Sequence, residues 1–377
     1  MKIGIAAGEI SGDNLGVGLI EAIKSRCPDA EFIGVGGPAM VEAGCKSLFP
    51  IDKLSVMGLI EVLRHYRELH GIRSQLIQYF IENPPDVFIG IDYPGFNIGL
   101  ETKLKEKGIK TVHYVCPQVW AWREGRLPKI AKAVDLILAI LPFEEDYLKK
   151  YQIPARYIGH NLADEIPDQV DQNSMREKWA IPRNKKVIAL MPGSRLKEWQ
   201  YHMDVFVDTA KWCLEKRSDL HFIAVMVNQK AEDLFRSQIQ NSAPDLPVTF
   251  IINNSFDSIA ASDAVLCVSG TAALEIMLLK RPMVVAYRMA FLSYHVFKRL
   301  LKTAYISLPN LLSKEQLVPE YIQDQVTVEN LGSDLMKFLE QPEKLVVLQE
   351  KFQQIHDQLR CNANEQAANA VLTLCER

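Results

Sequence analysis

The sequence lacks several features that define common protein classes. It contains no run of about 18 apolar residues, the length that a membrane-spanning helix needs. Its seven cysteines are scattered, with no Cys-x-x-Cys pair and no Cys/His grouping at zinc spacing, a pattern typical of reduced thiols in a cytoplasm. Its net charge is −3, whereas a general nucleic-acid-binding protein should be basic. We therefore expect neither a transmembrane protein, nor a disulfide scaffold, nor a nucleic-acid-binding protein.

The usual short motifs of nucleotide and metal sites are also missing. There is no Walker phosphate loop, no G-x-G-x-x-G fingerprint, no G-x-S-x-G and no H-E-x-x-H. Asp-x-Asp, the natural way to hold a divalent metal on a nucleotide diphosphate, is absent as well. A nucleotide diphosphate would therefore need another source of positive potential, and we expect no metal site and no cofactor.

What is present is an ordinary globular composition arranged as two α/β halves. The 377 residues are 48% apolar and 24% charged, which suits about two or three domains. Short apolar runs alternate with amphipathic stretches, and continuous apolar runs are typical of parallel strands with both sheet faces covered. The expected strands are residues 3–7, 32–35, 87–91, 111–115 and 136–141 in the first half, and 186–191, 222–227, 248–252, 264–268 and 283–287 in the second.

A polar segment separates the two halves. Residues 165–185 carry Pro167, Pro182 and several Asp, Asn and Gln residues, which is typical of a linker. Residues 333–377 have a wholly helical pattern. The sequence therefore predicts two Rossmann-like domains, the first over residues 1–164 and the second over residues 165–344.

One strand-to-helix turn in the second half is suited to an anion. It reads Pro-Gly-Ser-Arg and includes Gly193, Ser194 and Arg195. Gly193 lets a ligand approach free backbone N–H groups, and Arg195 adds a forked donor. The alternative is a plain strand-to-helix turn with a solvated arginine.

A second such turn reads Ser-Gly-Thr-Ala-Ala-Leu-Glu at residues 269–275. Ser269 or Thr271 can cap the helix, and the small residues after Gly270 allow close approach. Glu275 could accept hydrogen bonds from a ribose, or it could simply favour the helix dipole. Two anion-binding turns in one half favour a nucleotide diphosphate there.

Asp92 is the strongest candidate for a catalytic residue in the first half. It follows the buried strand 87–91 and enters the loop 92–97. A carboxylate at the carboxyl end of a buried parallel strand costs free energy unless it is paired or used, and such a position suits a general base. The alternative is an aspartate that orders its own turn. Residues 8–13, Gly-Glu-Ile-Ser-Gly-Asp, look like a glycine-rich ligand loop.

Aromatic and histidine residues near these loops have two interpretations. Trp120 and Trp122 are two residues apart in the segment 115–123. They could form an aromatic wall for a sugar or acyl chain, or one ring could pack in the core while the other covers the surface. His113 and His160 adjoin apolar residues and are interpreted as structural.

Two apolar stretches with interleaved basic residues suit an anionic bilayer surface. A core-facing helix with a charged outer face explains the same spacing. The first stretch, residues 56–80, contains Met57, Leu63, Arg64, Arg67 and Arg73, and the second, around residues 291–302, contains Lys298, Arg299 and Lys302.

Taken together, short words along nearly the whole chain resemble one known family. The words are AGEISGD at 7–13, PDVFIGIDYPGFN at 85–97, VCPQVWAWR at 115–123, LPFE at 141–144, IGH at 158–160, PGSR at 192–195, SGTAALE at 269–275, YRM at 287–289, SLPNLL at 307–312 and RCNANEQAA at 360–368. In this order they resemble the lipid-A-disaccharide synthases, bacterial glycosyltransferases of lipopolysaccharide biosynthesis. The resemblance implies a two-domain glycosyltransferase B (GT-B) fold, in agreement with the two α/β halves.

The resemblance also implies a reaction. Members transfer 2,3-diacylglucosamine from its UDP donor to 2,3-diacylglucosamine 1-phosphate (lipid X), releasing UDP and a β-1,6-linked disaccharide 1-phosphate. By this likeness Asp92 is the base on the acceptor 6-hydroxyl, Arg195 stabilises the leaving UDP, and Asn310 in SLPNLL matches a residue implicated in activity. The implied substrate-binding residues are Gly8, Glu9, Ser11, Gly12, Gly193, Ser194, Ser269, Gly270, Thr271, Glu275, Arg288 and Met289.

The same resemblance implies a place and partners. The acyl substrates imply a cytoplasmic protein bound peripherally to the anionic inner face of the inner membrane. Residues 345–377 are expected to return to the first domain, and exchange of this tail between subunits would give a swapped homodimer. Two rival functions stay open: a UDP-sugar epimerase of the same fold, and a lipid- or UDP-sugar-binding protein without catalysis.

Overall fold

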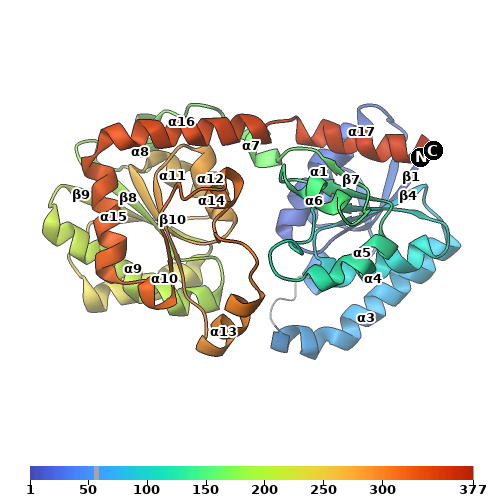
Figure 1. Ribbon diagram of the computed structural model, residues 1–377, viewed down its shortest axis with the longest axis horizontal. Helices are drawn as coiled ribbons and strands as arrows, with labels where there is room; N and C mark the ends of the chain where they lie inside the picture. The colour runs from blue at the N-terminus through green and yellow to red at the C-terminus, as the bar shows by residue number, and fades with distance from the viewer. Residues whose placement is uncertain (55–58, 377) are drawn as a thin grey trace. The chain divides into compact units, whose positions relative to one another are not determined.

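The computed structural model describes residues 1–54 and 59–376 and divides the chain into two compact units (Figure 1). The first unit comprises Met1–Asp164 and Gln358–Arg377, and the second comprises Glu165–Asp357. The last residues therefore belong with the first unit, but the boundary differs from the expected one. Residues 345–357, which lie within helix α16 (Pro342–Leu359), belong to the second unit.

The first unit is built on a seven-stranded parallel sheet in the order β3-β2-β1-β4-β5-β6-β7. Its central strands are almost wholly buried, because helices cover both faces and every side chain of the strand must be apolar. The two short edge strands β3 and β7 were not expected from the sequence. The strands are β1 (Lys2–Ala7), β2 (Glu31–Val35), β3 (Cys45–Ser47), β4 (Val87–Ile91), β5 (Lys110–Tyr114), β6 (Leu136–Ala139) and β7 (Ala155–Tyr157).

Helices from both ends of the chain cover this sheet. Helix α17 (Ala363–Glu376) packs against α1 (Ile10–Lys24), and Ala367, Ala368 and Val371 share one core cluster with Leu19 and Ile20. A separate cluster joins β4 to α3 (Leu59–Glu82) and α4 (Pro94–Lys105). The remaining helices of this unit are α2 (Pro38–Glu42), η1 (Ile51–Lys53), η2 (Glu124–Arg126), α5 (Leu127–Ala133), α6 (Glu144–Lys149) and α7 (Asn161–Glu165).

The second unit repeats the design with a six-stranded parallel sheet in the order β10-β9-β8-β11-β12-β13. The expected strands of this half are all present, and the three-residue edge strand β13 is additional. The strands are β8 (Lys186–Met191), β9 (Leu220–Met226), β10 (Val248–Ile252), β11 (Ala264–Val268), β12 (Met283–Tyr287) and β13 (Glu320–Ile322).

The core of the second unit lies between this sheet and helices α9 (Leu196–Lys216) and α15 (Val328–Glu340). Phe206, Phe222 and Phe235 are fully buried in it. The other elements of this unit are α8 (Gln172–Lys178), α10 (Gln229–Ser242), α11 (Ser255–Ala261), α12 (Thr271–Leu278), α13 (Phe291–Leu300), α14 (Leu308–Ser313) and η3 (Gln323–Gln325).

Both sheets share one topological feature. From β1 the chain builds outward through β2 and β3, then returns to place β4 on the opposite side of β1. The second sheet does the same around β8 and β11. In open α/β sheets ligands bind at the carboxyl ends of the strands where the order reverses. Each unit therefore has one such switch point.

Candidate active site

The switch point of the first unit brings together two segments that lie far apart in the sequence. Ala7 pairs with Ile91 in the last register of β1 and β4, so Gly8 and Asp92 follow neighbouring strand ends. A Cβ on Gly8 would lie 2.5 Å from Cδ1 of Tyr93, so glycine is needed for this close approach. The structure thus brings the expected glycine-rich loop and the expected base to one edge of the sheet.

Asp92 sits in an unusual backbone conformation. Its φ is 47° and that of Tyr93 is 45°, two consecutive left-handed residues without glycine. Each costs on the order of 1–3 kcal/mol, and such residues persist where the surroundings over-determine them. The Asp92 N–H donates to the Tyr114 carbonyl at 2.8 Å, and the side chain is half-buried. This geometry favours a functional aspartate over one that merely orders a relaxed turn.

The loop residues beside Asp92 are placed differently from one another. Glu9 is the N-cap of α1, and together with burial it raises the pKa of Tyr93. Ser11 is exposed in the first turn of α1. Gly12 lies against the strand ends, with its Cβ position 3.4 Å from Ala7. Ser11 is therefore the exposed polar side chain of this loop, and Glu9 lies half-buried at the start of α1.

Asn97 is a site residue that was not selected from the sequence, although it ends the loop 92–97. Its buried Nδ2 donates to the Asp92 carbonyl at 2.8 Å, and to those of Ala6 and Ile91 at 3.2 Å each. One amide therefore ties together the ends of β1 and β4. The sequence signal was a single Asn two residues after Pro-Gly, which is too common to single out.

Asp13 has a structural role that explains part of the first motif. It is buried, and its carboxylate accepts the backbone N–H groups of Gly37 at 2.8 Å and of Ala39 and Met40 at 3.1 Å each. It thus caps helix α2 from across the sheet edge.

In the second unit the Pro-Gly-Ser-Arg turn already holds an anion. Gly193 has φ 111°, which requires glycine in practice. Glu198 Oε2 accepts the N–H of Ser194 at 2.8 Å and that of Arg195 at 3.2 Å. Glu198 Oε1 faces Nη1 of Arg195 at 3.2 Å, and that guanidinium is mostly exposed. Glu198, which was not among the predicted site residues, therefore occupies the donors of this turn, and binding of an external anion here stays a prediction.

The start of α12 differs from the start of α9, where Glu198 occupies the backbone donors. The N-cap of α12 is Gly270, which has no side chain to cap the first turn, and nothing lies within 4 Å of a Cβ placed on this glycine. Gly270 and Thr271 are exposed. Ser269 Oγ donates to the Ile306 carbonyl at 3.0 Å, so this serine fixes a neighbouring loop. The open backbone N–H groups of this turn are the better place for an anion from outside.

Glu275 lies one turn further along α12. Ser255 Oγ donates to its Oε1 at 2.9 Å, and burial raises the pKa of the carboxyl above its usual value. A carboxylate has a second oxygen that can accept further hydrogen bonds. The geometry leaves both interpretations of Glu275, ribose contact and helix-dipole partner, in place.

Arg288 and Met289 are engaged by the protein itself. The Arg288 guanidinium donates to the carbonyls of Gln323 and Val326. Gln323 also accepts the Met289 N–H at 2.7 Å and donates to its carbonyl at 3.0 Å. Buried His202 accepts the Arg288 N–H through Nε2, so Nδ1–H donates to the Glu198 carbonyl at 2.7 Å. Arg288 and Met289 therefore link the end of β12 to residues 323–326 and to α9.

Asn310 is held in a buried hydrogen-bond network before β13. It is fully buried, and its Oδ1 accepts the N–H groups of Leu317 and Val318 at 2.8 and 2.9 Å. Its Nδ2 donates to the Val318 carbonyl at 2.9 Å and to Glu320 Oε1 at 2.8 Å. Glu320 also accepts the N–H of Ser307, the N-cap of α14. Both side-chain polar atoms of Asn310 have partners within the protein, and its catalytic role stays a prediction.

The tryptophan motif is tied to the Leu-Pro-Phe-Glu motif. Trp120 Nε1 donates to Glu144 Oε1 at 3.0 Å, and its ring meets Phe143 edge-on. Trp122 instead carries the Arg123 guanidinium 3.8 Å from its ring centre. Trp120 is therefore packed against the core, and Trp122 is half-buried beside Arg123. Burial raises the pKa of Glu144 to about 7.

The two expected membrane stretches differ in the structure. Met57 and the side chains of Leu63 and Arg64 lie outside the described residues, Arg67 is exposed, and Arg73 packs against Gly99. The described part of α3 buries Leu69, Ile72, Leu76 and Phe80, which is a core-facing stripe. Helix α13, by contrast, exposes Phe291 at 71% together with Leu300, Lys298 and Arg299, and Lys302 follows in an exposed position.

Neither a metal cluster nor a spanning helix is found in the part of the chain that the structure describes. No group of three or more His, Cys, Asp or Glu residues there could hold a metal ion. None of the helices there combines the length and apolar character that a bilayer crossing requires.

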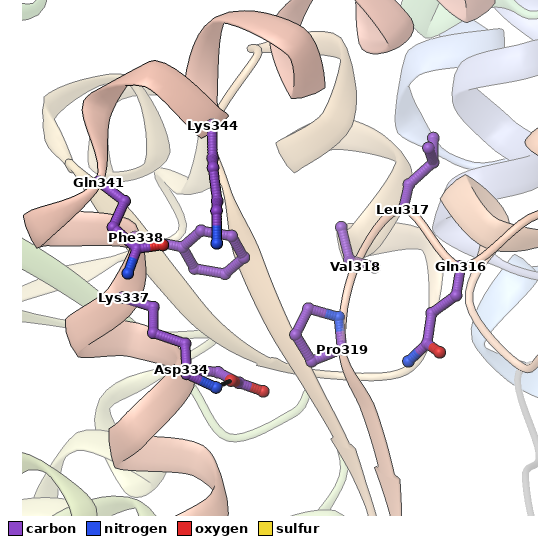
Figure 2. Close-up of a pocket in the computed structure, with 9 residues that line it drawn as sticks. All are labelled: Gln316, Leu317, Val318, Pro319, Asp334, Lys337, Phe338, Gln341 and Lys344. Carbon is purple, nitrogen blue, oxygen red and sulfur yellow. Dashed lines mark hydrogen bonds and ion pairs between the residues drawn. The ribbon is translucent and has the colours of Figure 1, made fainter.

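A cavity of about 250 Å³ in the second unit lies away from the switch point (Figure 2). It lies between residues 316–319, which precede β13, and the last turns of α15. Lys337 on its wall pairs with Asp334 at 2.7 Å. None of the expected site residues lines this cavity, so the switch points remain the candidate site.

Two parallel sheets, each with one switch point, form two doubly wound α/β units, an architecture that binds its ligands at the carboxyl ends of the strands. Solved structures agree on the fold. The chain resembles UDP-GlcNAc 2-epimerase from Neisseria meningitidis (TM-score 0.65, 14% identity, all of both chains covered) and WaaG, a glycosyltransferase involved in lipopolysaccharide biosynthesis (TM-score 0.58, 14% identity, 98% of this chain and 99% of that one). The protein therefore has the GT-B fold of glycosyltransferases.

Comparison of sequences identifies the family. The family model described as lipid-A-disaccharide synthetase matches residues 3–371. The lipid-A-disaccharide synthase of Vibrio campbellii is 48% identical over 377 residues, covering 100% of this chain and 99% of the relative. That of Cellvibrio japonicus is 46% identical over 374 residues, covering 99% and 97%. The chain belongs to the lipid-A-disaccharide synthase family.

Proposed function

We propose that the protein transfers 2,3-diacylglucosamine from its UDP donor to the 6-hydroxyl of 2,3-diacylglucosamine 1-phosphate. The products are the β-1,6-linked disaccharide 1-phosphate and UDP. The observation that carries this proposal is Asp92, a half-buried carboxylate held in a left-handed turn at the switch point of the first unit, in a chain of this family.

Asp92 acts in this proposal as the general base. It accepts the proton of the acceptor 6-hydroxyl while that oxygen forms a bond to the anomeric carbon and the bond from that carbon to the UDP oxygen breaks, which inverts the anomeric configuration. A positioned base of this kind contributes roughly 10²–10⁴-fold to the rate. Glu9 and Ser11 border the same turn and are the residues offered for binding the acceptor.

The second unit binds the donor nucleotide in this proposal. The open start of α12, with Gly270 and Thr271, receives the diphosphate, and Glu275 meets the ribose. The exposed guanidinium of Arg195 adds positive charge as UDP leaves. Backbone N–H groups aimed at developing negative charge supply the stabilisation that a metal gives in other transferases, so the reaction needs no metal in this proposal.

The lipid substrates require contact with a bilayer. Helix α13 supports this role because it presents an exposed phenylalanine beside Lys298 and Arg299. Exposed apolar and basic groups on one short helix suit the interface of an anionic membrane. We propose a peripheral location on the inner face of the inner membrane; a swapped homodimer through the C-terminal tail is part of the same proposal.

A UDP-sugar epimerase is the second candidate, because the fold is shared with the Neisseria enzyme. An epimerase would change its sugar nucleotide without an acyl acceptor. To test both, the protein is incubated in mixed micelles with UDP-2,3-diacylglucosamine, with and without 2,3-diacylglucosamine 1-phosphate, in EDTA. Equal yields of UDP and disaccharide, formed only with the acceptor, support the transferase. An epimeric sugar nucleotide formed without the acceptor supports the epimerase, and nucleotide binding without turnover supports a binding protein.

A further inference from the structure

Three buried polar atoms without a hydrogen-bond partner gather beneath the Asp92 turn. They are Asn97 Oδ1, Glu101 Oε2 and His113 Nε2, out of five such atoms in the part of the chain that the structure describes. All three residues are at most 1% exposed. A buried polar atom without a partner costs free energy, so a cluster of them signals something that the protein holds there.

The fold brings these three residues to one place. Asn97 and Glu101 are one turn apart on α4, so their side chains share a face. Gly90 of β4 is in register with His113 of β5, and a Cβ on Gly90 would overlap Glu101 Oε1 and lie 2.9 Å from Asn97 Cβ. His113 Nδ1 lies 2.7 Å from Glu101 Oε1. The missing side chain of Gly90 thus makes room for a polar layer between α4 and the sheet.

This layer is linked directly to the proposed base. The amide nitrogen of Asn97 donates to the carbonyls of Ala6, Ile91 and Asp92, while its oxygen is buried without a hydrogen-bond partner among the described residues. Asn97 can hold the left-handed Asp92 turn only in one orientation of its amide. A partner for the amide oxygen would lock that orientation, because a flipped amide would lose the three carbonyl contacts.

Water is the ligand whose chemistry fits. Asn97 Oδ1 is an acceptor and needs a donor, and water offers two. Glu101 Oε2 accepts from water as a carboxylate and donates to it when the carboxyl is protonated. His113 Nε2 can accept from water, or donate to it when the ring is charged. Buried waters typically satisfy two to four otherwise unpaired polar groups of this kind.

We propose that Asn97, Glu101 and His113 hold ordered water beneath the Asp92 turn and that this layer positions Asp92 for proton transfer. The inference rests on the proposed function of Asp92. Asn97, Glu101 and His113 are positioning residues, because they act on the reaction through Asp92 and not by touching the substrate. Loss of the layer leaves the donor site of the second unit unchanged.

The first test is a high-resolution crystal structure of the unsubstituted protein, which requires no turnover. Water within hydrogen-bond distance of Asn97 Oδ1 and Glu101 Oε2 supports the proposal. A layer that is dry, or filled by rotated protein side chains, overturns it whether or not the enzyme makes the disaccharide.

The second test compares Asn97→Asp with Asn161→Asp. Both replace a buried asparagine of the first unit by its isostere, but Asn161 bonds the side chains of Tyr114 and Asn364, whereas Asn97 bonds the backbone at the ends of β1 and β4. Asn97→Asp should lower kcat by about 10–100-fold, the cost of misplacing a catalytic group by about 1 Å. KM for the UDP donor and the dissociation constant of UDP should stay within about twofold, and Asn161→Asp should keep kcat.

A crystal structure of Asn97→Asp should show Asp92 leaving the left-handed region. Equal kcat losses in both variants would assign the effect to general destabilisation, and a normal kcat in Asn97→Asp would overturn the positioning role. If the unsubstituted protein makes no disaccharide, the proposed function fails instead. The two crystal structures still show whether water fills the layer and whether Asp92 keeps its left-handed backbone.

Discussion

The carboxylate of Glu198 accepts a hydrogen bond from the backbone N–H of Ser194 at 2.8 Å. The same carboxylate also receives the N–H and the guanidinium of Arg195, so the start of α9 carries an anion that the protein supplies. The N-cap of α12 is Gly270, which brings no side chain to the start of that helix. A diphosphate near the first turn would meet like charge, whereas at the second it would meet free donors.

Replacing Glu198 by Gln should tighten UDP binding by about fivefold. Removing a like charge close to a phosphate is worth on the order of 1 kcal/mol in water, and every 1.4 kcal/mol is about tenfold in affinity. The weaker cap should lower the free energy of unfolding by about 1 kcal/mol. Titration calorimetry with UDP and urea unfolding measure the two effects. Weaker UDP binding would show instead that Glu198 shapes the turn for the nucleotide.

Glu232→Gln is the matched control for Glu198→Gln. Glu232 also lies in the first turn of a helix of the second unit, where Asn228 provides the cap and Arg236 pairs with the glutamate. The control should leave UDP affinity unchanged, because β9, which precedes α10, is not at the switch point.

Gly270→Ala separates the fold of α12 from its proposed ligand. The φ of Gly270 is extended and nothing lies near its Cβ position, so the free energy of unfolding should change by less than about 0.5 kcal/mol. UDP affinity should fall by at least about fivefold, because the methyl group fills the space through which a phosphate reaches the N–H groups. Gly125→Ala, in the first unit and equally open, should change neither quantity. Unaltered UDP binding in Gly270→Ala would place the diphosphate elsewhere.

Asp92→Asn should lower kcat by at least about 10²-fold, because the amide cannot accept the acceptor's proton. The dissociation constant of UDP should stay within about twofold, since the change lies in the other unit. Asp86→Asn is the control, because Asp86 lies at the opposite end of β4, where it accepts the Lys2 N–H at 2.7 Å. Steady-state disaccharide formation measures both variants. Near-normal turnover in Asp92→Asn would remove Asp92 from the role of base.

The sequence was enough to predict most of the fold, for a physical reason. Strands buried on both faces must be apolar throughout, so β1, β4, β8 and β11 stand out as continuous runs. The strands β3, β7 and β13 have three residues each at or near sheet edges, and they contain Lys46, Arg156 and Glu320. Their pairing depends on tertiary contacts that leave no local pattern, so they could not be predicted.

The sequence predicted the backbone turns of the candidate site. It did not predict the side chains that hold these turns in place. Gly8, Asp92, Gly193 and Gly270 follow strand ends, which the sequence pattern already marks. Glu198 had a usable signal, because it stands three residues after Arg195 at the spacing of a capping box. Partners that come from distant segments, such as Glu320 for Asn310 or His113 for Glu101, have no signal of this kind.

Charge reversal at Lys298 and Arg299 tests α13 as the membrane contact. Each basic residue near an anionic surface contributes about 1 kcal/mol, so Lys298→Glu with Arg299→Glu should weaken binding to phosphatidylglycerol-containing liposomes by at least about 30-fold. Lys149→Glu with Lys150→Glu reverses two adjacent exposed lysines of α6 and should have little effect. Sedimentation with liposomes measures the difference. Equal losses in both double variants would mean that binding follows net charge and not α13.

Stability should fall as the pH rises from about 5 to about 7, because of Glu144. Burial raises the pKa of Glu144 from its ordinary 4.5 to about 7, against the opposing hydrogen bonds from Leu141 and Trp120. Between these two values the folded chain holds a proton that the unfolded chain has lost, so raising the pH favours unfolding. Over this range the free energy of unfolding should fall by roughly 3 kcal/mol in total. Below and above the range Glu144 adds no further pH dependence.

Urea unfolding of Glu144→Gln across this pH range isolates the effect. The variant should lose most of the slope, while burial of Glu101, whose pKa is also raised, leaves a remainder in both proteins. Asp146→Asn changes an exposed acid two residues away and should keep the full slope. If Glu144→Gln keeps it too, the carboxylate is already ionised at pH 5. The hydrogen bonds from Trp120 and Leu141 would then outweigh the effect of burial on the pKa. Glu144 would carry a buried negative charge at every pH above about 5.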